Sequence, residues 1–259
     1  MQALVGYSGF VGSSLLRQAE FGATFRSTNI AGIRNGQFDT VVCAGVPAMK
    51  WVAERDPDAD IANIRGLFDH LSTVDAGQFV LISTVDVFPD SRGKDEDDAP
   101  DESLLTAYGR NRLWLERAVR DRFPNALIVR LPGLVGPGLR KNAIFDFRND
   151  NSLHLIDSRG VFNFYPMVRL WGDIQAALAA GLKLVHLTAA PLSIREVAQT
   201  AFGLDFTNVV ADRQPASYDL QTRHAALFGG AGRHTYSARE CMLAIQAYAQ
   251  SEPPSKPIA

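Results

Sequence analysis

The first half of the chain alternates short apolar runs with stretches in which apolar positions recur at helical spacing. The apolar runs predict five strands, at residues 3–5, 23–25, 40–44, 79–82 and 126–131. Two amphipathic stretches, residues 60–71 and 104–122, predict helices, and Pro124 ends the second of them. Strands that alternate with helices form parallel sheets covered on both faces. The pattern therefore predicts an α/β fold with a doubly wound parallel sheet.

Two features qualify this pattern. Residues 29–38, between the second and third expected strands, contain two glycines and little helical periodicity, so we expect an abbreviated crossover. The second half is interrupted by glycine and proline beyond Gly136, then regains order. It predicts two further helices and one further strand, at residues 173–180, 193–202 and 184–187.

The composition excludes several classes of protein. The chain has 259 residues, of which 46% are hydrophobic, which is ample for a sizeable core. With 26 basic and 28 acidic side chains, it carries no electrostatic footprint for nucleic acid or an anionic membrane. The longest apolar stretches, such as residues 176–182, are too short to span a bilayer. We therefore expect a soluble protein without nucleic-acid or membrane partners.

The few cysteines and histidines give no sign of a metal or a disulfide. Cys43 and Cys241 are far apart, and Cys43 lies in an apolar run that should be buried. The five histidines lack the spacing of metal ligands, so no metal is expected. A reducing, cytoplasmic compartment fits this usage best. The sequence leaves a homodimer open as the assembly.

A glycine-rich turn follows the first expected strand and opens a helix. Gly6, Gly9 and Gly12 have the spacing of a dinucleotide-binding turn: the first permits a tight turn, the second admits the pyrophosphate, and the third allows close helix packing. Ser8 could add a hydroxyl donor, and Phe10 and Val11 complete the segment. The turn predicts a nicotinamide dinucleotide cofactor. The alternative is a simple strand–helix turn.

The end of the second strand bears on the choice of cofactor. An Asp or Glu there would bind the 2′-hydroxyl of NAD, but the chain has Arg26 and Ser27 instead. These side chains suit a 2′-phosphate, so NADP is favoured over NAD. The alternative is that Arg26 simply faces solvent.

Tyr108 and Arg112 lie four residues apart, on one face of the same expected helix. A cation close to a phenol can lower the pKa of the tyrosine toward neutrality where water is partly excluded. Such pairs occur on many helices, so the interpretation depends on the other motifs of the chain.

Together with the glycine turn and the tyrosine pair, several further segments resemble the extended short-chain dehydrogenase/reductase family, nearly from end to end. The similarity is to its nucleotide-sugar epimerases, dehydratases and reductases, and around Tyr108 and Glu116 to the dTDP-4-dehydrorhamnose reductases. The further segments are residues 42–45, 63, 79–88, 130–138, 171–173, 184–187, 193–198 and 218–230.

The resemblance implies a fold, a set of domains and a reaction. It implies a Rossmann NAD(P)-binding domain over residues 1–135, a mixed substrate lobe with returning sheet elements over 136–250, and a tail over 251–259. The implied activity is that of an NAD(P)-dependent oxidoreductase or epimerase acting on a nucleotide-activated sugar. The alternative is a catalytically weak NAD(P)-binding sensor or scaffold module of the same fold.

The resemblance also assigns roles to single residues. It makes Thr84 the catalytic Ser/Thr and Tyr108 the acid/base. It places Arg112 where the family has a lysine that binds the nicotinamide ribose, and arginine differs in bulk and donor geometry. The cofactor would also contact Ala44, Gly45 and Pro132.

Asp86 separates the possible reactions. It follows Thr84 by two residues, so on an extended strand end it projects to the same side. Val85 and Asp86 replace the acid pair of the sugar dehydratases, and the missing acid at Val85 argues against water elimination. Asp86 is either a base for epimerisation or a structural cap for the following loop.

Three other segments are weaker candidates. The acidic run over residues 90–102 predicts a solvated loop rather than an interaction tail. The polar triplet 140–142 could meet a substrate diphosphate or be a basic loop. Lys50 and Trp51 follow the strand-end Gly45 and could line the cleft, or Trp51 could anchor the core.

Overall fold

The computed structural model describes residues 1–254, which form two compact units that are discontinuous in sequence. The first unit comprises Met1–Pro89, Asp98–Arg130 and Trp171–Val185. The second comprises Asp90–Asp97, Leu131–Leu170 and the described chain from His186 onward. The expected domain boundary at residue 135 stays a prediction, because compact units in a folded chain do not show which part folds alone.

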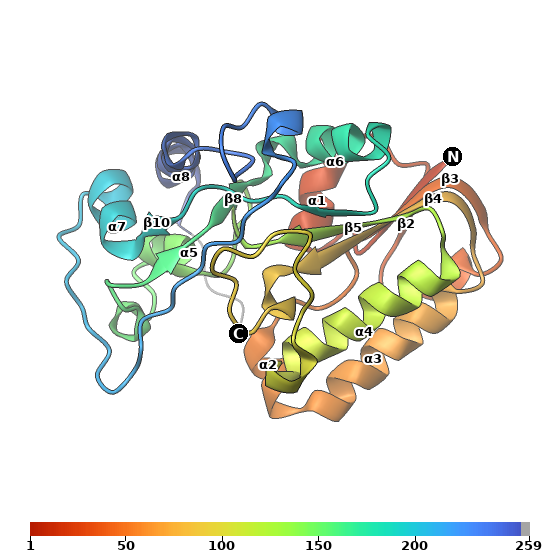
Figure 1. Cartoon of the computed structure of the whole chain (residues 1–259), viewed down its shortest axis with the longest axis horizontal. Coiled ribbons are helices and arrows are strands. Elements are labelled where there is room, and N and C mark those ends of the chain that lie inside the picture. Colours follow the sequence, from red (N-terminus) through yellow and green to blue (C-terminus); the bar gives the residue numbers. More distant parts are fainter. Residues whose placement is uncertain (255–259) are drawn as a thin grey trace. The chain divides into compact units, whose positions relative to one another are not determined.

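A six-stranded sheet forms the centre of the fold, with strand order β2-β1-β3-β4-β5-β9 (Figure 1). The pairs β1–β2, β1–β3 and β3–β4 are parallel. All five expected strands are confirmed, and the strand expected at 184–187 returns to the sheet as β9. The bounds are β1 Gln2–Val5, β2 Ala23–Phe25, β3 Gln37–Cys43, β4 Asp75–Thr84, β5 Ala126–Leu131 and β9 Leu184–His186.

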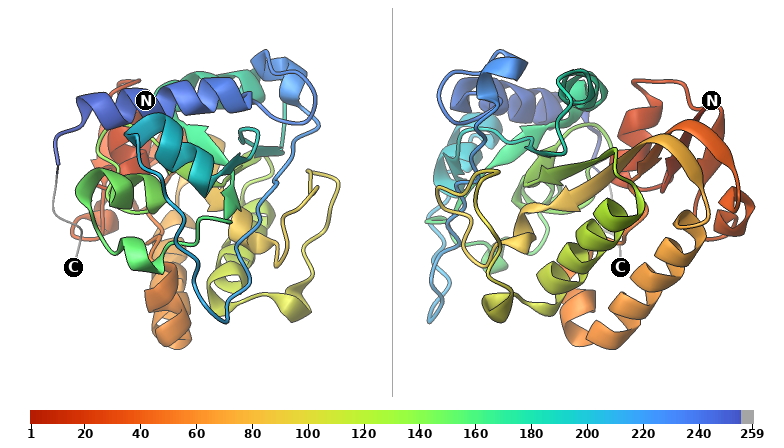
Figure 2. Two further views of the ribbon diagram at one scale, coloured as in Figure 1. Left: turned by 90° about the vertical axis from the view of Figure 1, so that its left-hand side faces the viewer. Right: turned by 45° about the vertical axis from the view of Figure 1, so that its right-hand side comes forward.

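Helices cover both faces of this sheet, as the doubly wound prediction requires. On one face lie α1 (Phe10–Leu16) and α6 (Leu170–Ala179); on the other, α3 (Pro57–Leu71) and α4 (Ala107–Arg122) run side by side (Figures 1 and 2). The helix α2 (Lys50–Arg55) precedes α3.

The helices expected at 60–71, 104–122 and 173–180 are confirmed with shifted ends, and capping residues set the starts of the first two. The carboxylate of Asp56 accepts a hydrogen bond from the N–H of Ala59, with Pro57 as the first helical residue of α3. The hydroxyl of Thr106 accepts from the N–H of Gly109 and so starts α4 at Ala107. A cap fixes the helix start more sharply than apolar periodicity does.

The expected short crossover is confirmed. Between β2 and β3 the chain makes only a 3₁₀ turn, Ile30–Ile33, and Ile33 is fully buried. Ile33 belongs to the apolar core that lies between the sheet and the two helices α3 and α4. The fully buried members of that core include Ala3, Val41, Cys43, Leu71, Phe79, Val119 and Ile128.

The second unit contains two small sheets and three helices. Its paired strands are β6 (Gly133–Val135) with β8 (Phe164–Pro166), which are parallel, and β7 (Val161–Phe162) with β10 (Leu192–Ser193), which are antiparallel. Its helices are α5 Ala143–Asn149, α7 Ile194–Phe202 and α8 Ala238–Ser251.

One helix of the second unit, α7, was expected, and two, α5 and α8, were missed. The expected helix 193–202 is α7, capped by Ser193, whose hydroxyl accepts from the N–H of Glu196. The helix α8 was not predicted, although Ser237 and Glu240 form a capping box at its start. Ser251, placed in the expected tail, is the last residue of α8, and residues 255–259 of that tail lie outside the described part of the chain.

The acidic segment is a largely exposed loop, as expected, but two of its acids are bound to distant parts of the chain. Within the second unit, the carboxylate of Glu96 accepts hydrogen bonds from the N–H groups of His186 and Arg223 at 2.7 and 2.9 Å and from the Thr222 hydroxyl at 2.6 Å. Asp95 is buried and pairs with Arg233 at 3.0 Å. The sequence did not predict these contacts, because a run of charges does not reveal partners that lie 90 or more residues away.

Candidate functional site

The glycine turn joins β1 to α1, and the protein itself requires two of its three glycines. Gly6 has a φ of +84°, and a Cβ there would lie 2.4 Å from the carbonyl oxygen of Ala44. A Cβ at Gly12 would lie 2.1 Å from the carbonyl oxygen of Gly6. Larger residues at these two positions would therefore force the backbone apart.

Gly9 differs from the other two. It is exposed, has an ordinary φ of −77°, and a Cβ there would contact only the Gly6 carbonyl oxygen, at 3.4 Å. The fold therefore does not require a glycine at this position. The open space is a cradle that a side chain would fill, and it fits a bound diphosphate. No acidic side chain lies in the first turn of α1 to repel one.

The adjacent strand ends carry the other candidates for cofactor contacts. The N–H of Gly6 donates to the carbonyl of Phe25 at 2.7 Å, so the end of β2 lies directly beside the glycine turn. Arg26 and Ser27 follow and are exposed, and the Arg26 Nε donates to the Thr28 hydroxyl at 3.0 Å.

The remaining candidates in this part of the first unit differ in exposure. Ser8 is exposed, whereas Phe10, Val11, Ala44 and Gly45 are half-buried. A Cβ on Gly45 would lie 3.0 Å from a Val5 methyl, so the residue after Ala44 must also be small.

Thr84 and Asp86 lie together at the end of β4. The Thr84 hydroxyl accepts the N–H of Asp86 at 3.1 Å and so begins the 3₁₀ turn Val85–Val87. One carboxylate oxygen of Asp86 lies 3.4 Å from the Thr84 hydroxyl. The cap is thus provided by Thr84, while the Asp86 carboxylate points to another partner.

Tyr108 reaches this strand end because α4 packs against it without a side chain between the backbones. A Cβ on Gly109 would lie 2.1 Å from the carbonyl oxygen of Asp86. The neighbouring Tyr108 is 7% exposed, and its N–H donates to the Glu54 carboxylate at 3.0 Å. The structure therefore gathers Thr84, Asp86 and Tyr108 at one end of β4.

Arg112 lies across the Tyr108 ring, with its guanidinium carbon 3.7 Å from the ring centroid. The guanidinium binds both carboxylate oxygens of Asp60 and donates to the Pro47 and Tyr108 carbonyls. Both charged side chains are buried, at 5% and 8% exposure. Among the described residues, the Arg112 Nε has no hydrogen-bond partner.

The electrostatics of Tyr108 differ from the simple expectation. Burial raises the pKa of Tyr108 above its ordinary value and outweighs the lowering by Arg112. Asp86 and Asp60 act in the raising direction as well, and Lys50 in the lowering one. The arginine acts in the expected direction, but it does not bring the phenol toward neutrality in the protein alone.

Sequence reasoning gave Lys50 only as a weak candidate and missed Glu54 and Asp60. Lys50 pairs with Asp86, with its ammonium 2.8 Å from the carboxylate. A buried arginine on α4 requires a carboxylate partner, so Arg112 itself indicates that an acid must lie close to it in the fold. Local patterns do not show which of the many acids supplies it. Trp51 is 59% exposed, so it is not a core anchor.

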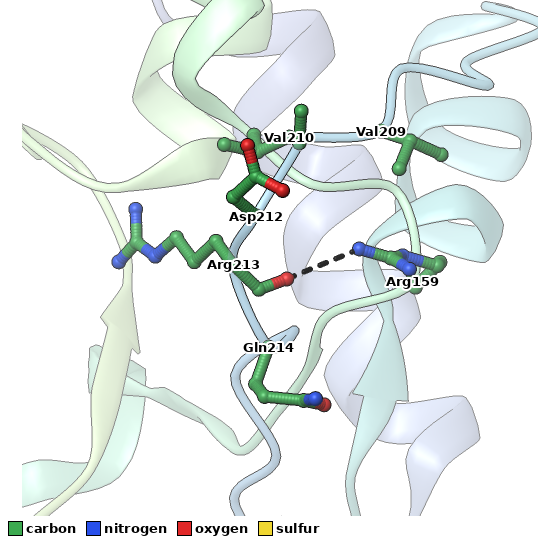
Figure 3. A pocket seen from close by; sticks show the side chains of 7 residues that line it. Arg159, Val209, Val210, Asp212, Arg213 and Gln214 are labelled. Atoms are coloured by element: carbon green, nitrogen blue, oxygen red, sulfur yellow. Dashed lines mark hydrogen bonds between the residues drawn. The ribbon is translucent and has the colours of Figure 1, made fainter.

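Other candidates belong to the second unit. Pro132 directly follows β5 and is buried, whereas Arg140 and Lys141 are exposed and Asn142 caps α5. A polar hollow in this unit is lined by residues 209–214 and by Arg159, which is bound to Asp157 and to the carbonyl of Arg213 (Figure 3). None of the site residues expected from the sequence lines this hollow.

No described helix could cross a membrane, and the described residues contain no cluster of His, Cys, Asp or Glu suited to a metal. The sequence matches no protein-family model and is similar to no curated protein.

Solved structures show the fold clearly. The dTDP-4-dehydrorhamnose reductase of Bacillus anthracis in complex with NADP aligns with a TM-score of 0.74 and 17% identity, over 95% of this chain and 96% of that one. The reductase of the same name from Clostridium acetobutylicum gives 0.70 and 18%, over 96% and 98%. The UDP-N-acetylglucosamine 4-epimerase of Bacillus cereus gives 0.69 and 15%, over 99% and 98%. The chain therefore has the same Rossmann-like fold as these enzymes, and the predicted fold class is confirmed.

Proposed function

We propose that the chain binds NADP(H) and reduces the carbonyl group of a nucleotide-activated sugar. The observation that carries the proposal is the close packing of Gly109 against the Asp86 carbonyl, which brings Tyr108 to the end of β4, where Thr84 lies. Because β1, β3 and β4 are parallel neighbours, this cluster lies at the same edge of the sheet as the glycine turn. An acid/base and a cofactor cradle thus share one edge.

The glycine turn would hold the pyrophosphate, with Gly6 and Gly12 closing the backbone and Gly9 leaving room. Ser8, Phe10, Val11, Ala44 and Gly45 would line this part of the site, and Pro132 stays a predicted contact. Arg26 and Ser27 would meet the 2′-phosphate, which favours NADP over NAD. Support for a nicotinamide cofactor comes from the structural neighbours bound to NADP and NADPH.

When bound, the nicotinamide supplies or accepts the hydride. In the reduction, Tyr108 would donate a proton from its hydroxyl to the substrate oxygen, and Thr84 would hydrogen-bond the same oxygen. Burial keeps the pKa of Tyr108 high, which suits a residue that must carry its proton at neutral pH. Arg112 is bound to Asp60 and Pro47, so its main contribution would be to hold the Tyr108 ring; ribose binding by Arg112 would require it to leave these partners.

Asp86 favours reduction over epimerisation. As a base it would have to remove a proton from a sugar carbon, but its carboxylate is bound to the Lys50 ammonium and lies beside the Thr84 hydroxyl. The Val85 position is buried and carries no acid, which argues against dehydration.

An isotope experiment would test this choice. We expect no deuterium from solvent at the sugar carbon next to the carbonyl, and we expect the same result for Asp86→Asn. Incorporation that depends on Asp86 would overturn reduction in favour of epimerisation.

A second candidate function is a catalytically weak NAD(P)-binding sensor or scaffold. The commitment of Arg112 to Asp60 favours it, because that cation is not available to a ligand. Turnover of NADPH with a panel of nucleotide sugars separates the two functions. Tyr108→Phe should lose about 10²–10⁴-fold in rate without losing cofactor binding; full turnover in that variant would remove Tyr108 from the mechanism.

The cofactor part has its own test. Gly9→Val should abolish NADPH binding while leaving the unfolding temperature near that of the parent, since the fold does not need a glycine there. Gly12→Val is the matched control and should destabilise the protein itself. Equal affinities for NAD and NADP in a titration would overturn the role of Arg26.

The proposed location is a reducing one, the cytoplasm. Both cysteines are free and buried, and burial raises the pKa of Cys43 to about 11 and of Cys241 to about 12. Thiols of this kind are inert structural side chains. A homodimer stays the proposed assembly, to be checked by the mass of the protein in solution.

A further inference from the structure

Two cations, Arg112 and Lys50, act on Tyr108, and they differ in their exposure to solvent and ligands. Arg112 is buried and bound to Asp60, whereas the Lys50 side chain is 46% exposed. Its partner Asp86 is 20% exposed. Ligands or solvent ions can weaken or break a charge pair at the surface of a site. Breaking a buried bidentate pair has a large free-energy cost.

The helix α2 holds this second cation in place. Glu54, one turn after Lys50 on α2, accepts the N–H of Tyr108 at 3.0 Å. The same helix therefore presents one side chain to the backbone of Tyr108 and another to the carboxylate of Asp86. Asp86 is in turn fixed by the Thr84 hydroxyl and by the packing of its carbonyl against Gly109. Three segments, α2, the end of β4 and α4, thus meet at Tyr108.

We propose that Lys50 and Asp86 form an opposed charge pair that controls the proton carried by the Tyr108 hydroxyl, with Lys50 favouring its release and Asp86 favouring its retention. The proposal rests on the proposed function, in which Tyr108 is the acid/base. In this role Lys50 is a positioning residue that acts through Tyr108. The cation of this pair, Lys50, lies on α2 and not on α4. The spacing of residues around Tyr108 therefore does not reveal it.

The other charges near Tyr108 are accounted for. Arg112 on its own helix lowers the pKa of Tyr108, and Asp60 on α3 raises it. Glu54 contacts the backbone of Tyr108 through its carboxylate. Asp86 raises the pKa and Lys50 lowers it, so the two members of the pair act with opposite signs on one group.

The test is a titration of Tyr108 in the protein alone, followed by ultraviolet absorbance. The signal of Tyr108 is obtained by subtracting the matching Tyr108→Phe variant, because the chain has six tyrosines. We expect Lys50→Met to move the titration to higher pH and Asp86→Asn to move it to lower pH. Lys50→Arg should restore the titration close to that of the parent.

Arg55→Met is the matched control, because it removes a cation from the same helix that lies over the Trp51 ring instead of near Asp86. It should leave the titration unchanged. Equal titrations for Lys50→Met and Arg55→Met would overturn the proposal, as would shifts of the same sign for Lys50→Met and Asp86→Asn. A loss of stability in Lys50→Met without a shift would also overturn it. If Lys50→Met does not fold, the sign of the Asp86→Asn shift decides: a shift to higher pH, or none, overturns the proposal.

Kinetics provide the second readout. In the reduction, the rate should fall as pH rises through the Tyr108 pKa, so Lys50→Met should extend the active range to higher pH with little change in KM. The two proposals can fail separately. Absence of turnover would overturn the proposed function and leave the titration result intact. Normal turnover that depends on Tyr108, with no Lys50 effect on either readout, would overturn only this inference.

Discussion

Two buried arginine–carboxylate pairs in the first unit show how similar interactions serve different ends. Arg130 and Glu116 are 2% and 0% exposed, and their two hydrogen bonds measure 3.0 and 2.7 Å. Arg112 and Asp60 are 5% and 8% exposed and are also bound through two hydrogen bonds. Each pair fixes α4, the first to β5 and the second to α3.

The difference lies in what surrounds the charges. Glu116 also accepts the Ser83 hydroxyl at 2.6 Å, so the core pair ties α4 to the strand that ends at Thr84. Arg112 instead lies over the Tyr108 ring and leaves its Nε without a partner among the described residues. A buried pair adds little net stability but is costly to break. The core pair therefore specifies the architecture, and the site pair holds a reactive side chain.

The largest expected effect comes from breaking the core pair. Arg130→Met should lower the free energy of unfolding by about 3–5 kcal/mol, because it leaves the buried Glu116 carboxylate with only the longer contact to Arg120, at 3.5 Å. Urea unfolding followed by circular dichroism measures the loss. The double variant Arg130→Met with Glu116→Leu removes both charges and should recover most of the stability; a double variant as unstable as the single one would contradict this account.

The next largest effect concerns the close packing of α4 against the end of β4, which both arginine–carboxylate pairs support. Gly109→Ala should cost about 1–3 kcal/mol of unfolding free energy, since its Cβ would overlap the Asp86 carbonyl and push α4 away from the end of β4. Activity should fall more than stability, because Tyr108 moves with the helix. The matched change Gly66→Ala on α3 meets no atom within 4 Å and should be neutral or slightly stabilising. Equal activity in the two variants would contradict the site geometry.

A smaller effect separates the roles of the two arginines. Arg112→Lys should cost about 1–2 kcal/mol of unfolding free energy, because an ammonium cannot maintain both the paired contact with Asp60 and the bond to the Pro47 carbonyl. We expect turnover to fall as the Tyr108 ring loses its support. Arg130→Lys should lower stability similarly while leaving the kinetic constants closer to the parent. A large gain in activity in Arg112→Lys would show instead that the native site has drifted from a lysine-based one.

The sequence predicted the first unit well because its signals are local. The strands around Val41 and Phe79 are continuous apolar runs, and the short crossover follows from Gly32 and Gly36. The family resemblance singled out Thr84 and Tyr108, which both lie at the end of β4, and their catalytic roles stay predictions. The glycine turn was predicted as a motif, but only the structure shows that Gly9 alone is not required by the fold.

Contacts distant in sequence could not be predicted. Asp60 is one of many acids at helix positions that the sequence pattern predicts to be exposed. Only the fold brings it to Arg112, 52 positions away. Glu96 meets Thr222 across 126 positions, so the acidic run looked like a solvated loop. The helix α8 was not predicted, although Ser237 and Glu240 carry a local capping signature.

The smallest expected effect concerns the charge of Glu54, which holds the start of α4 at the edge of the site. Burial acts to raise the pKa of Glu54. The pKa is nevertheless below its ordinary value, because the carboxylate accepts hydrogen bonds from the Thr106 hydroxyl and from the N–H groups of Tyr108 and Ala107, and because Lys50 is positively charged. A depressed carboxyl pKa stabilises the folded state above the unfolded pKa of about 4.3, and this stabilisation is lost as pH falls through the folded value. Glu54→Gln should therefore cost less than about 1 kcal/mol at pH 7 and nothing below the folded pKa, where the parent carboxyl is neutral as well. Urea midpoints across this range measure it, with Glu20→Gln as an exposed control in the same unit. A cost that stays constant with pH would show that Glu54 acts by shape and hydrogen bonding alone, and that its charge does not help to hold the start of α4.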